Sequence, residues 1–269
     1  MRPTRREMLR VGLSGLTAVG LGGTMPALVS KFAHAAKPQA PTAIADDNVF
    51  VIVQLTGGND GLNTVVPTGN DAYRKARPTI GLSDGLHRLD DAHALNPAMT
   101  AFKELFDAGK LAVINGCGYP QPSRSHFAAM EMWHTASDAN AQTSGWLGHY
   151  LDHVQRGTPG ALKAVNVGAE LPQALVADRS VVPSIQTLDD LAGANVSAAR
   201  QCRARRANDA IVDADAIRKV TARYRPDASY PGGLGQPLRL IAQLIAAQMG
   251  TKLFYCQIGG FDTHASQLA

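Results

Sequence analysis

An uncharged, β-branched run that ends in a glycine-rich turn most constrains the fold of this chain. The run covers residues 51–55, and the turn after it, residues 57–63, contains a single carboxylate, Asp60. A continuous apolar run of this kind is typical of a strand buried on both faces, as in a parallel sheet covered by helices. Glycines in the turn would let a ligand approach the main chain. We therefore expect Asp60 at the carboxyl end of a central strand, where open α/β sheets bind ligands.

The N-terminal segment is predicted to be an export leader. Residues 4–10, Thr-Arg-Arg-Glu-Met-Leu-Arg, fit the twin-arginine pattern, a weakly apolar run follows over 11–29, and residues 33–35 form a small-x-small cleavage site. Gly, Ser, Thr and Pro interrupt the apolar run, which disfavours the alternative of a membrane anchor. We expect residues 1–35 to be removed, and the mature protein to be periplasmic or extracellular without a stable membrane span.

Charge and composition exclude some classes of partner. The whole chain has a formal net charge of +4, but the leader holds five of its basic residues and one acidic residue, so residues 36–269 are formally neutral. The basicity is therefore no argument for a nucleic-acid or membrane-surface partner. With 45% hydrophobic and 18% charged residues, the chain is predicted to have a linker over 36–48 and one domain over 49–269. Nothing in the sequence indicates an oligomeric state.

The three cysteines have no CxxC or metal-finger spacing, so a disulfide framework is not expected. Cys117 and Cys256 lie in or at the end of apolar runs and are expected to be buried, inert thiols.

The remaining pattern predicts an α/β fold with a mostly parallel central sheet and helices on both faces. Residues 64–91 are predicted to be extended and then surface loop, and residues 189–235 an insertion or cap that contains a helix over 199–223. The predicted strands cover 49–55, 110–115, 162–167, 180–185 and 253–258, and the other predicted helices 96–108, 125–135, 143–155 and 237–249.

Three polar clusters follow three of the predicted strands: Asp60, then Ser125 with His126, then Asp262 with His264. If the strands are parallel, the three clusters emerge at one edge of the sheet. Asp262 and His264 are two apart in an extended segment and project to the same side. Carboxylate and imidazole groups suit zinc, manganese or similar ions, and a serine beside such an ion can attack phosphorus or sulfur.

Each of these residues has a structural alternative. An aspartate in a Gly-Gly-Asn-Asp-Gly turn most often makes turn hydrogen bonds, so Asp60 need not be a ligand. Ser125 can simply cap its helix, and His126 is expected to be a packing or hydrogen-bonding neighbour rather than a ligand.

Four motifs together resemble the exported family known as domain of unknown function 1501. They are Gln54-Leu55-x-Gly57-Gly58-Asn59-Asp60-Gly61-Leu62-Asn63, Gly118-Tyr119-Pro120 with Ser125-His126-Phe127, Gly145-Trp146-Leu147-Gly148, and Gly259-Gly260-Phe261-Asp262-Thr263-His264-x-x-Gln267. That family is similar to the alkaline phosphatase and sulfatase superfamily. The resemblance implies Asp60, Asp262 and His264 as ligands of a divalent metal and Ser125 as the nucleophile, with Asn59, Arg124, His126 and Gln267 in supporting positions.

The chain also departs from the family's pattern. Family members usually continue into Ser-Glu-Phe-Gly-Arg and Asp-His-Gly segments, which this sequence does not contain, and Asn96 and His149 stand where histidine and arginine are common. We therefore expect a fold that is incomplete at the C-terminus, with an open sheet edge and an incomplete site.

Two functions follow as hypotheses. The first is an exported, metal-dependent hydrolase of phosphate or sulfate esters on a small molecule or a polymer, or a fragment of one. The second is an exported binding or scaffold protein that keeps the fold without the chemistry. A serine esterase is disfavoured because no Gly-x-Ser-x-Gly motif is present.

Overall fold

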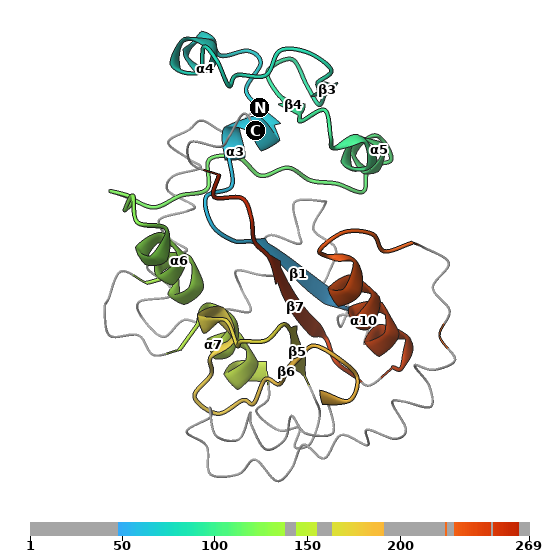
Figure 1. Cartoon of the computed structure of the whole chain (residues 1–269). Coiled ribbons are helices and arrows are strands. Elements are labelled where there is room, and N and C mark those ends of the chain that lie inside the picture. Colours follow the sequence, from blue (N-terminus) through green and yellow to red (C-terminus); the bar gives the residue numbers. More distant parts are fainter. Residues whose placement is uncertain are drawn as a thin grey trace, which may run out of the picture. The chain divides into compact units, whose positions relative to one another are not determined.

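The structure is a computed structural model, shown in Figure 1, and it describes residues 48–137, 144–154, 163–190, 224, 229–248 and 250–263. The predicted leader over 1–35, the helix over 199–223, His264 and Gln267 lie outside the described residues. Residues Phe50–Ala269 form one compact unit. No helix in the described part of the chain is long and apolar enough to cross a membrane.

Four parallel strands form the main sheet, in the order β1-β7-β5-β6. They are β1 (Phe50–Leu55), β5 (Ala164–Val167), β6 (Ser184–Ile185) and β7 (Leu253–Ile258). The prediction for β7 is confirmed at both ends, because its first four residues are an apolar run buried on both faces. The predicted strand over 180–185 is confirmed only for its last two residues.

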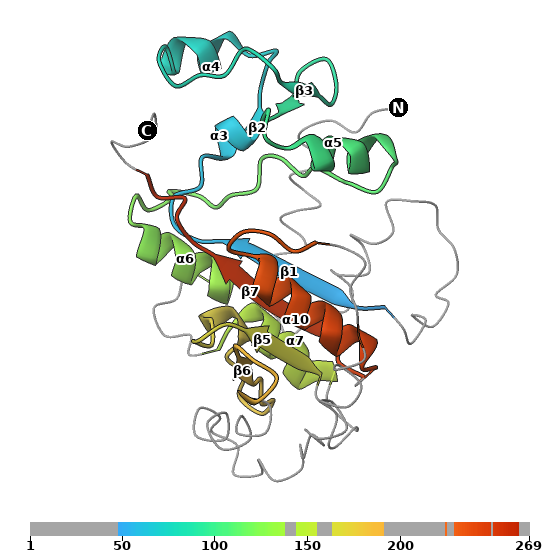
Figure 2. The ribbon, with the colours of Figure 1, turned by 45° about the vertical axis from the view of Figure 1, so that its right-hand side comes forward.

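Alternate residues of β5 and β7 point to opposite faces of the sheet, and each face is covered by a helix. Val165, Val167, Phe254 and Cys256 pack against α10 (Gly235–Ala246) in one buried cluster. Leu253 and Tyr255 pack on the other face against α7 (Trp146–Val154). Figure 2 shows α10 in front of the sheet and α7 behind it. The expected helices on both faces are therefore confirmed, and α10 begins two residues before the predicted Pro237.

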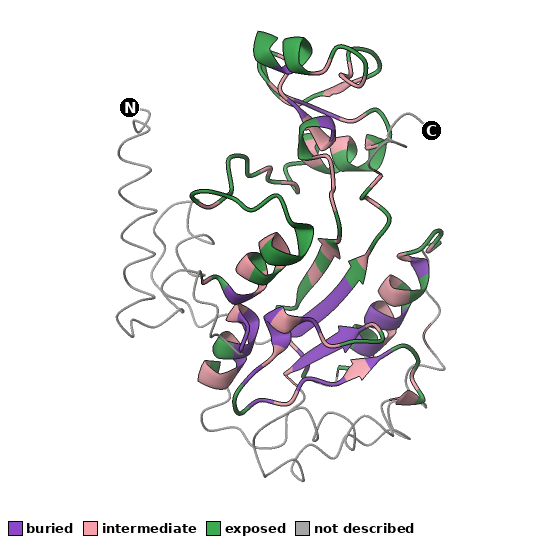
Figure 3. Cartoon of the chain, turned by 60° about the vertical axis from the view of Figure 1, so that its left-hand side comes forward, coloured by how far each residue is buried: buried purple, intermediate pink, exposed green. Residues whose placement is uncertain are grey.

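The prediction that β1 is a central strand buried on both faces is wrong. Its one hydrogen-bonded neighbour among the described strands is β7, so it lies at an edge of the sheet. Val51, Val53 and Leu55 are 36–40% exposed, and Figure 3 shows the contrast with the buried strands. The apolar pattern of β1 resembles that of a central strand, but α10 packs in one cluster with β5 and β7, and the same face of β1 stays partly exposed. β1 is thus an edge strand of the described sheet.

The predicted strand over 110–115 is also wrong. These residues have no regular secondary structure, and Ile114 is 70% exposed. The helix before them, α5 (Thr100–Asp107), begins later than its predicted start at Asn96, whose side chain instead accepts a hydrogen bond from the Ala98 N–H. Its apolar residues Phe102 and Leu105 are 48% and 44% exposed. A strand-like sequence pattern was therefore not enough to form a strand here, because the segment has no strand partner within the described residues.

The stretch over 64–91, predicted to have little regular structure, contains several short elements. α3 (Gly61–Thr64) leads into β2 (Val65–Val66), which pairs antiparallel with β4 (Ala94–Leu95), and β4 pairs with β3 (His87–Arg88). Helix α4 (Asp71–Ala76) precedes β3 in the chain. Val66, Ala94 and Leu95 are buried, together with Tyr73 of α4. This mostly polar stretch therefore buries a few apolar side chains of its own.

The Gly145-Trp146-Leu147-Gly148 motif lets α7 lie directly against backbone. A Cβ atom on Gly148 would be 1.9 Å from the Val176 carbonyl oxygen, and one on Gly145 would be 2.1 Å from the Gln173 oxygen. Both neighbours belong to the 3₁₀ turn η1 (Gln173–Leu175) and the residue after it. The glycines of this motif therefore have a packing role.

We expect Gly148→Ala to destabilise the protein by at least about 2 kcal/mol, because the new methyl group can be accommodated only by moving α7 away from η1. Gly118→Ala is the matched control, since a Cβ there meets no atom within 4 Å. Urea unfolding of both variants makes the measurement. Equal midpoints for the two would contradict the close packing of α7.

Candidate functional site

The adjacent strands β1 and β7 bring two of the predicted polar clusters to one cleft. Leu55 and Ile258 are paired in register, and the Thr56 N–H donates to the Ile258 carbonyl at 2.8 Å. The segments that leave the two strands therefore start side by side. They line a cleft of about 750 Å³, to which Asp60 and Asp262 both contribute, together with Arg77, His93 and residues 114–117. The predicted convergence is confirmed for these two carboxylates.

Two glycines of the turn after β1 allow this close approach. Gly57 has φ +93°, and a Cβ atom there would be 3.2 Å from the Asp262 Cβ. A Cβ on Gly58 would be 3.0 Å from the His126 Cε1 and 3.2 Å from the Asp262 Oδ1. Gly61 has open space around it. At the first two glycines the space beside the main chain is thus occupied by the protein's own side chains, and the approach of a ligand there stays a prediction.

His126 forms an ion pair with Asp262. Its Nε2 lies 3.4 Å from the Asp262 Oδ1, and the side chains are 47% and 36% exposed. The pair carries opposite charges only when the imidazole is protonated. His126 was expected to be a hydrogen-bonding neighbour, and the structure brings it to one of the predicted metal ligands.

Asp60 makes the turn hydrogen bonds that are the structural alternative to ligation. Its Oδ1 accepts from the Asn63 N–H at 3.2 Å and so caps α3. Its Oδ2 accepts from Arg77 Nη1 at 2.6 Å, in an ion pair whose side chains are only 18% and 20% exposed. Both carboxylate oxygens are therefore engaged, and a cationic side chain already offsets the charge.

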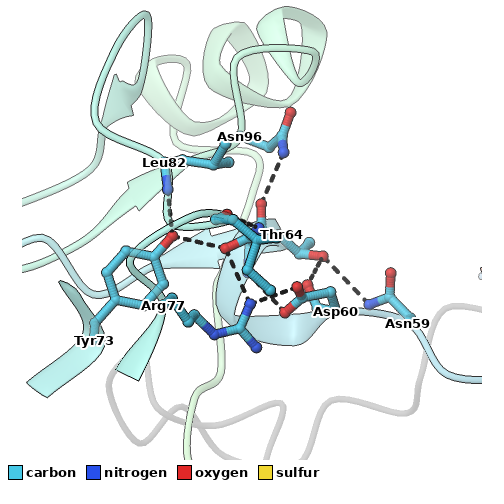
Figure 4. A network of polar contacts seen from close by, with 9 residues as sticks. Asn59, Asp60, Thr64, Tyr73, Arg77, Leu82 and Asn96 are labelled. Atoms are coloured by element: carbon cyan, nitrogen blue, oxygen red, sulfur yellow. Dashed lines mark hydrogen bonds and ion pairs between the residues drawn. The ribbon is translucent and has the colours of Figure 1, made fainter. Parts of the chain in front are cut away.

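A polar network behind Asp60 holds this part of the cleft in place (Figure 4). The side chain of the buried Asn63 is at its centre. Its Oδ1 accepts from the Tyr73 hydroxyl at 2.7 Å, and its Nδ2 donates to the Ile80 carbonyl at 2.8 Å. The Leu82 N–H donates to the Tyr73 hydroxyl, also at 2.8 Å. Because buried polar groups are costly when unpaired, these mutual bonds fix the geometry around Asp60 and Arg77.

Helix α6 (His126–Thr135) begins after Ser125, as predicted, and Ser125 is its N-cap. The Ser125 Oγ accepts from the Ala128 N–H at 3.4 Å, a long hydrogen bond, and the residue is exposed. Ser125 does not line the cleft; its neighbour His126 contacts the Asp262 that does. The structure therefore gives Ser125 a capping role and a place one residue away from the cleft's ion pair.

Polar contacts attach α6 to the sheet through Gln54 of β1. The Gln54 Oε1 accepts from the Tyr255 hydroxyl of β7 and lies 3.0 Å from the His134 Nε2, which must carry the proton to donate to it. Burial lowers the pKa of His134. Burial is also the main reason that the pKa of Tyr255 is raised to about 12. Both groups are therefore neutral near pH 7, and they fix the helix that carries Ser125 and His126.

The other predicted residues lie in varied places. Asn59 lines the cleft and donates to the Thr64 hydroxyl at 3.3 Å, whereas Arg124 is exposed on the loop before α6. Cys256 is buried, as expected, and burial raises the pKa of its thiol. The prediction that Cys117 is buried is wrong, because it is exposed at the cleft.

Within the described ranges, no group of three or more His, Cys, Asp or Glu side chains is close enough to hold a metal ion.

Sequence reasoning missed Arg77. It is the C-cap of α4 and follows a helix that was read as loop, so no periodic pattern pointed to it. The one signal was the Asn70-Asp71 pair ahead of an Ala-Tyr-Arg-Lys-Ala run, which is a helix start.

No protein-family model matches the chain, and neither a curated protein nor a solved structure matches it.

We expect Asp60→Asn to lower the free energy of unfolding by about 1–3 kcal/mol, because asparagine can still cap α3 but leaves the partly buried Arg77 without its counter-charge. Asp71→Asn is the matched control: the Asp71–Arg74 pair has the same chemistry with side chains 88% and 59% exposed, and its loss should cost under about 0.5 kcal/mol. Urea unfolding compares the two. Equal small effects would mean that Arg77 does not depend on Asp60.

Proposed function

We propose that this chain is an exported, metal-dependent hydrolase of phosphate or sulfate esters, or a fragment of one. The observation that carries the proposal is the meeting of Asp60 and Asp262 in one cleft at the carboxyl ends of two adjacent parallel strands. Ligands of open parallel sheets bind at this edge. The twin-arginine pattern supports export to the periplasm or the cell exterior. The resemblance to the domain of unknown function 1501 family supports the same reaction class.

The donor atoms at the Asp262 end of the cleft fit a divalent metal. A carboxylate oxygen and an imidazole nitrogen face each other there, and both are ligands of zinc and manganese. Asp60 fits less well, because Arg77 and the Asn63 N–H use one lone pair on each of its oxygens. Each carboxylate oxygen keeps a second lone pair, so Asp60 can join the set while staying paired. We assign the metal to Asp262 and Asp60 and, from the sequence, to His264, with His126 as the supporting residue beside Asp262 that can offer its imidazole nitrogen.

Ser125 is the proposed nucleophile. Its Oγ would form a bond to the phosphorus or sulfur of the ester, the bond to the leaving alcohol oxygen would break, and water would later release the phosphate or sulfate from the serine. The hydroxyl proton passes to solvent water as Ser125 attacks, the departing alkoxide takes a proton from solvent, and the serine oxygen regains a proton when water displaces it from the phosphate or sulfate. When bound, a divalent cation would lower the pKa of this hydroxyl and stabilise the negative charge that develops on the ester oxygens. Ser125 lies outside the cleft lining, so its support is its place next to His126, which contacts the cleft residue Asp262.

A specific observation favours the second function, a non-catalytic binding or scaffold protein. Both oxygens of Asp60 are used in bonds that stabilise the fold, and the described residues hold no three-residue metal group. Ser125 likewise has a capping role that needs no reaction. In this case the cleft would keep its architecture and bind a ligand without turnover.

We expect the purified chain to bind zinc or manganese and to hydrolyse generic phosphate or sulfate esters, with activity lost on chelation. Ser125→Asn should reduce turnover by more than about a thousandfold while retaining stability, because asparagine keeps the N-cap and removes the hydroxyl. Ser123→Ala is the control, since this neighbouring serine is exposed and only accepts a hydrogen bond from the Ser125 N–H. Metal analysis and steady-state kinetics give the readouts.

Absence of bound metal together with activity that survives Ser125→Asn would remove the proposal. Metal binding without any turnover would favour the binding or scaffold function.

A further inference from the structure

We propose that Arg77 is the anion-binding residue of the cleft and that it takes a tetrahedral oxyanion, the phosphoryl or sulfuryl end of a substrate. The inference rests on the proposed function and deepens it, because it names the group that would recognise the ester. It is carried by three features of Arg77: its place in the cleft, its fixed position, and the donors that it leaves unused.

Arg77 is held from both its backbone and its side chain. Its N–H donates to the Arg74 carbonyl at 3.3 Å, and its carbonyl accepts from the Gly81 N–H at 3.0 Å. The guanidinium carbon lies 5.9 Å from the centre of the Tyr73 ring, whose hydroxyl is fixed by Asn63 and Leu82. A side chain ordered in this way loses little conformational entropy when it binds a ligand.

The contact of Arg77 with Asp60 uses only one edge of the guanidinium. Nη1 alone donates, to the Asp60 Oδ2 at 2.6 Å and the Asn63 Oδ1 at 3.4 Å. Arg77 Nε and Nη2 have no hydrogen-bond partner in the described part of the chain, and Nη2 points away from the network in Figure 4. A purely structural arginine–carboxylate pair is frequently bidentate. Here the Asp60 Oδ1 is turned to the Asn63 N–H instead, and the second edge of the guanidinium remains available.

The charges around the cleft set the conditions for an anion. Asp60 offsets part of the Arg77 charge, and Asp262 would repel an anion, an effect that its partner His126 reduces when protonated. His93 also lines the cleft, with its Nδ1 3.1 Å from the Asp90 Oδ1. Arginine is suited to this setting because its planar fork can hold two oxygens of a phosphate or sulfate. A divalent cation at Asp262 would remove the repulsion and strengthen the same binding.

The test is an NMR titration of the full chain in the presence of a chelator, with no metal and no ester. The ¹H–¹⁵N signals of the arginine Nε–H groups are the readout. Inorganic phosphate and inorganic sulfate are added in separate arms, against chloride at matched ionic strength. Arg74, on the same helix and paired with Asp71 at the surface, is the internal control. We expect a saturable shift of the Arg77 signal with at least one of the two oxyanions and none for Arg74. The arm that saturates identifies phosphate or sulfate as the recognised group.

A variant separates anion binding from a structural role. Arg77→Lys keeps the charge beside Asp60 but loses the fork, so the anion affinity should fall by about tenfold or more. Arg74→Lys should leave it unchanged. If Arg77→Lys unfolds the protein, the wild-type Nε–H titration still decides the question.

No saturable shift of Arg77 with either anion, or the same shift for Arg74, would overturn the inference even if the chain hydrolyses esters. A saturable shift in a chain without metal binding or turnover would uphold the inference and count against the proposed hydrolase.

Discussion

The parallel pairing of β1 with β7 is the constraint on which the candidate site depends. Its register sets Leu55 opposite Ile258, so the two glycine-containing segments that follow leave the sheet together. Gly57 and Gly58 then permit Asp262 and His126 to come within van der Waals distance of the turn. A side chain at either position would force Asp262 or His126 to shift by a few tenths of an ångström, and at Gly57 it would also meet a strained positive φ. The glycine-rich turn therefore acts chiefly by letting two distant parts of the chain meet, more than by cradling a ligand itself.

The cleft has two ends with different electrostatic character. At one end, Asp60 and Arg77 are mutually paired, partly buried and fixed by the Asn63–Tyr73 network. At the other, Asp262 and His126 form a longer and more exposed pair. Ordered, low-exposure charges suit recognition because they need little reorganisation, whereas the exposed pair can open to admit a cation. Because of this asymmetry, we assign the anion to Arg77 and the metal chiefly to Asp262. Asp60 then lies between the two sites, paired with Arg77 and able to contact the metal.

Sequence patterns predicted those elements that bury apolar residues or cap helices. β7, α6, α7 and α10 were recognisable because continuous apolar runs, a serine N-cap and helical spacing depend on local sequence. The edge position of β1 and the lack of a strand over 110–115 depend on which partner a strand finds, and that is a tertiary property. The elements around Asn63 and Tyr73 are held by polar bonds, which leave no periodic signal. Arg77 was missed for the same reason, while Asp60 and Asp262 were found from the strands that precede them.

We propose that a divalent cation binds in the cleft between the ends of β1 and β7. Adding substoichiometric Mn²⁺ to the ¹⁵N-labelled chain tests this directly, because a bound paramagnetic ion broadens the signals of nearby amides. We predict that the amides of Gly58 and Thr263, which line the cleft from the segments after β1 and β7, broaden together and first. Broadening confined to exposed acidic residues such as Asp71 and Asp91, or equal broadening throughout the chain, would contradict it.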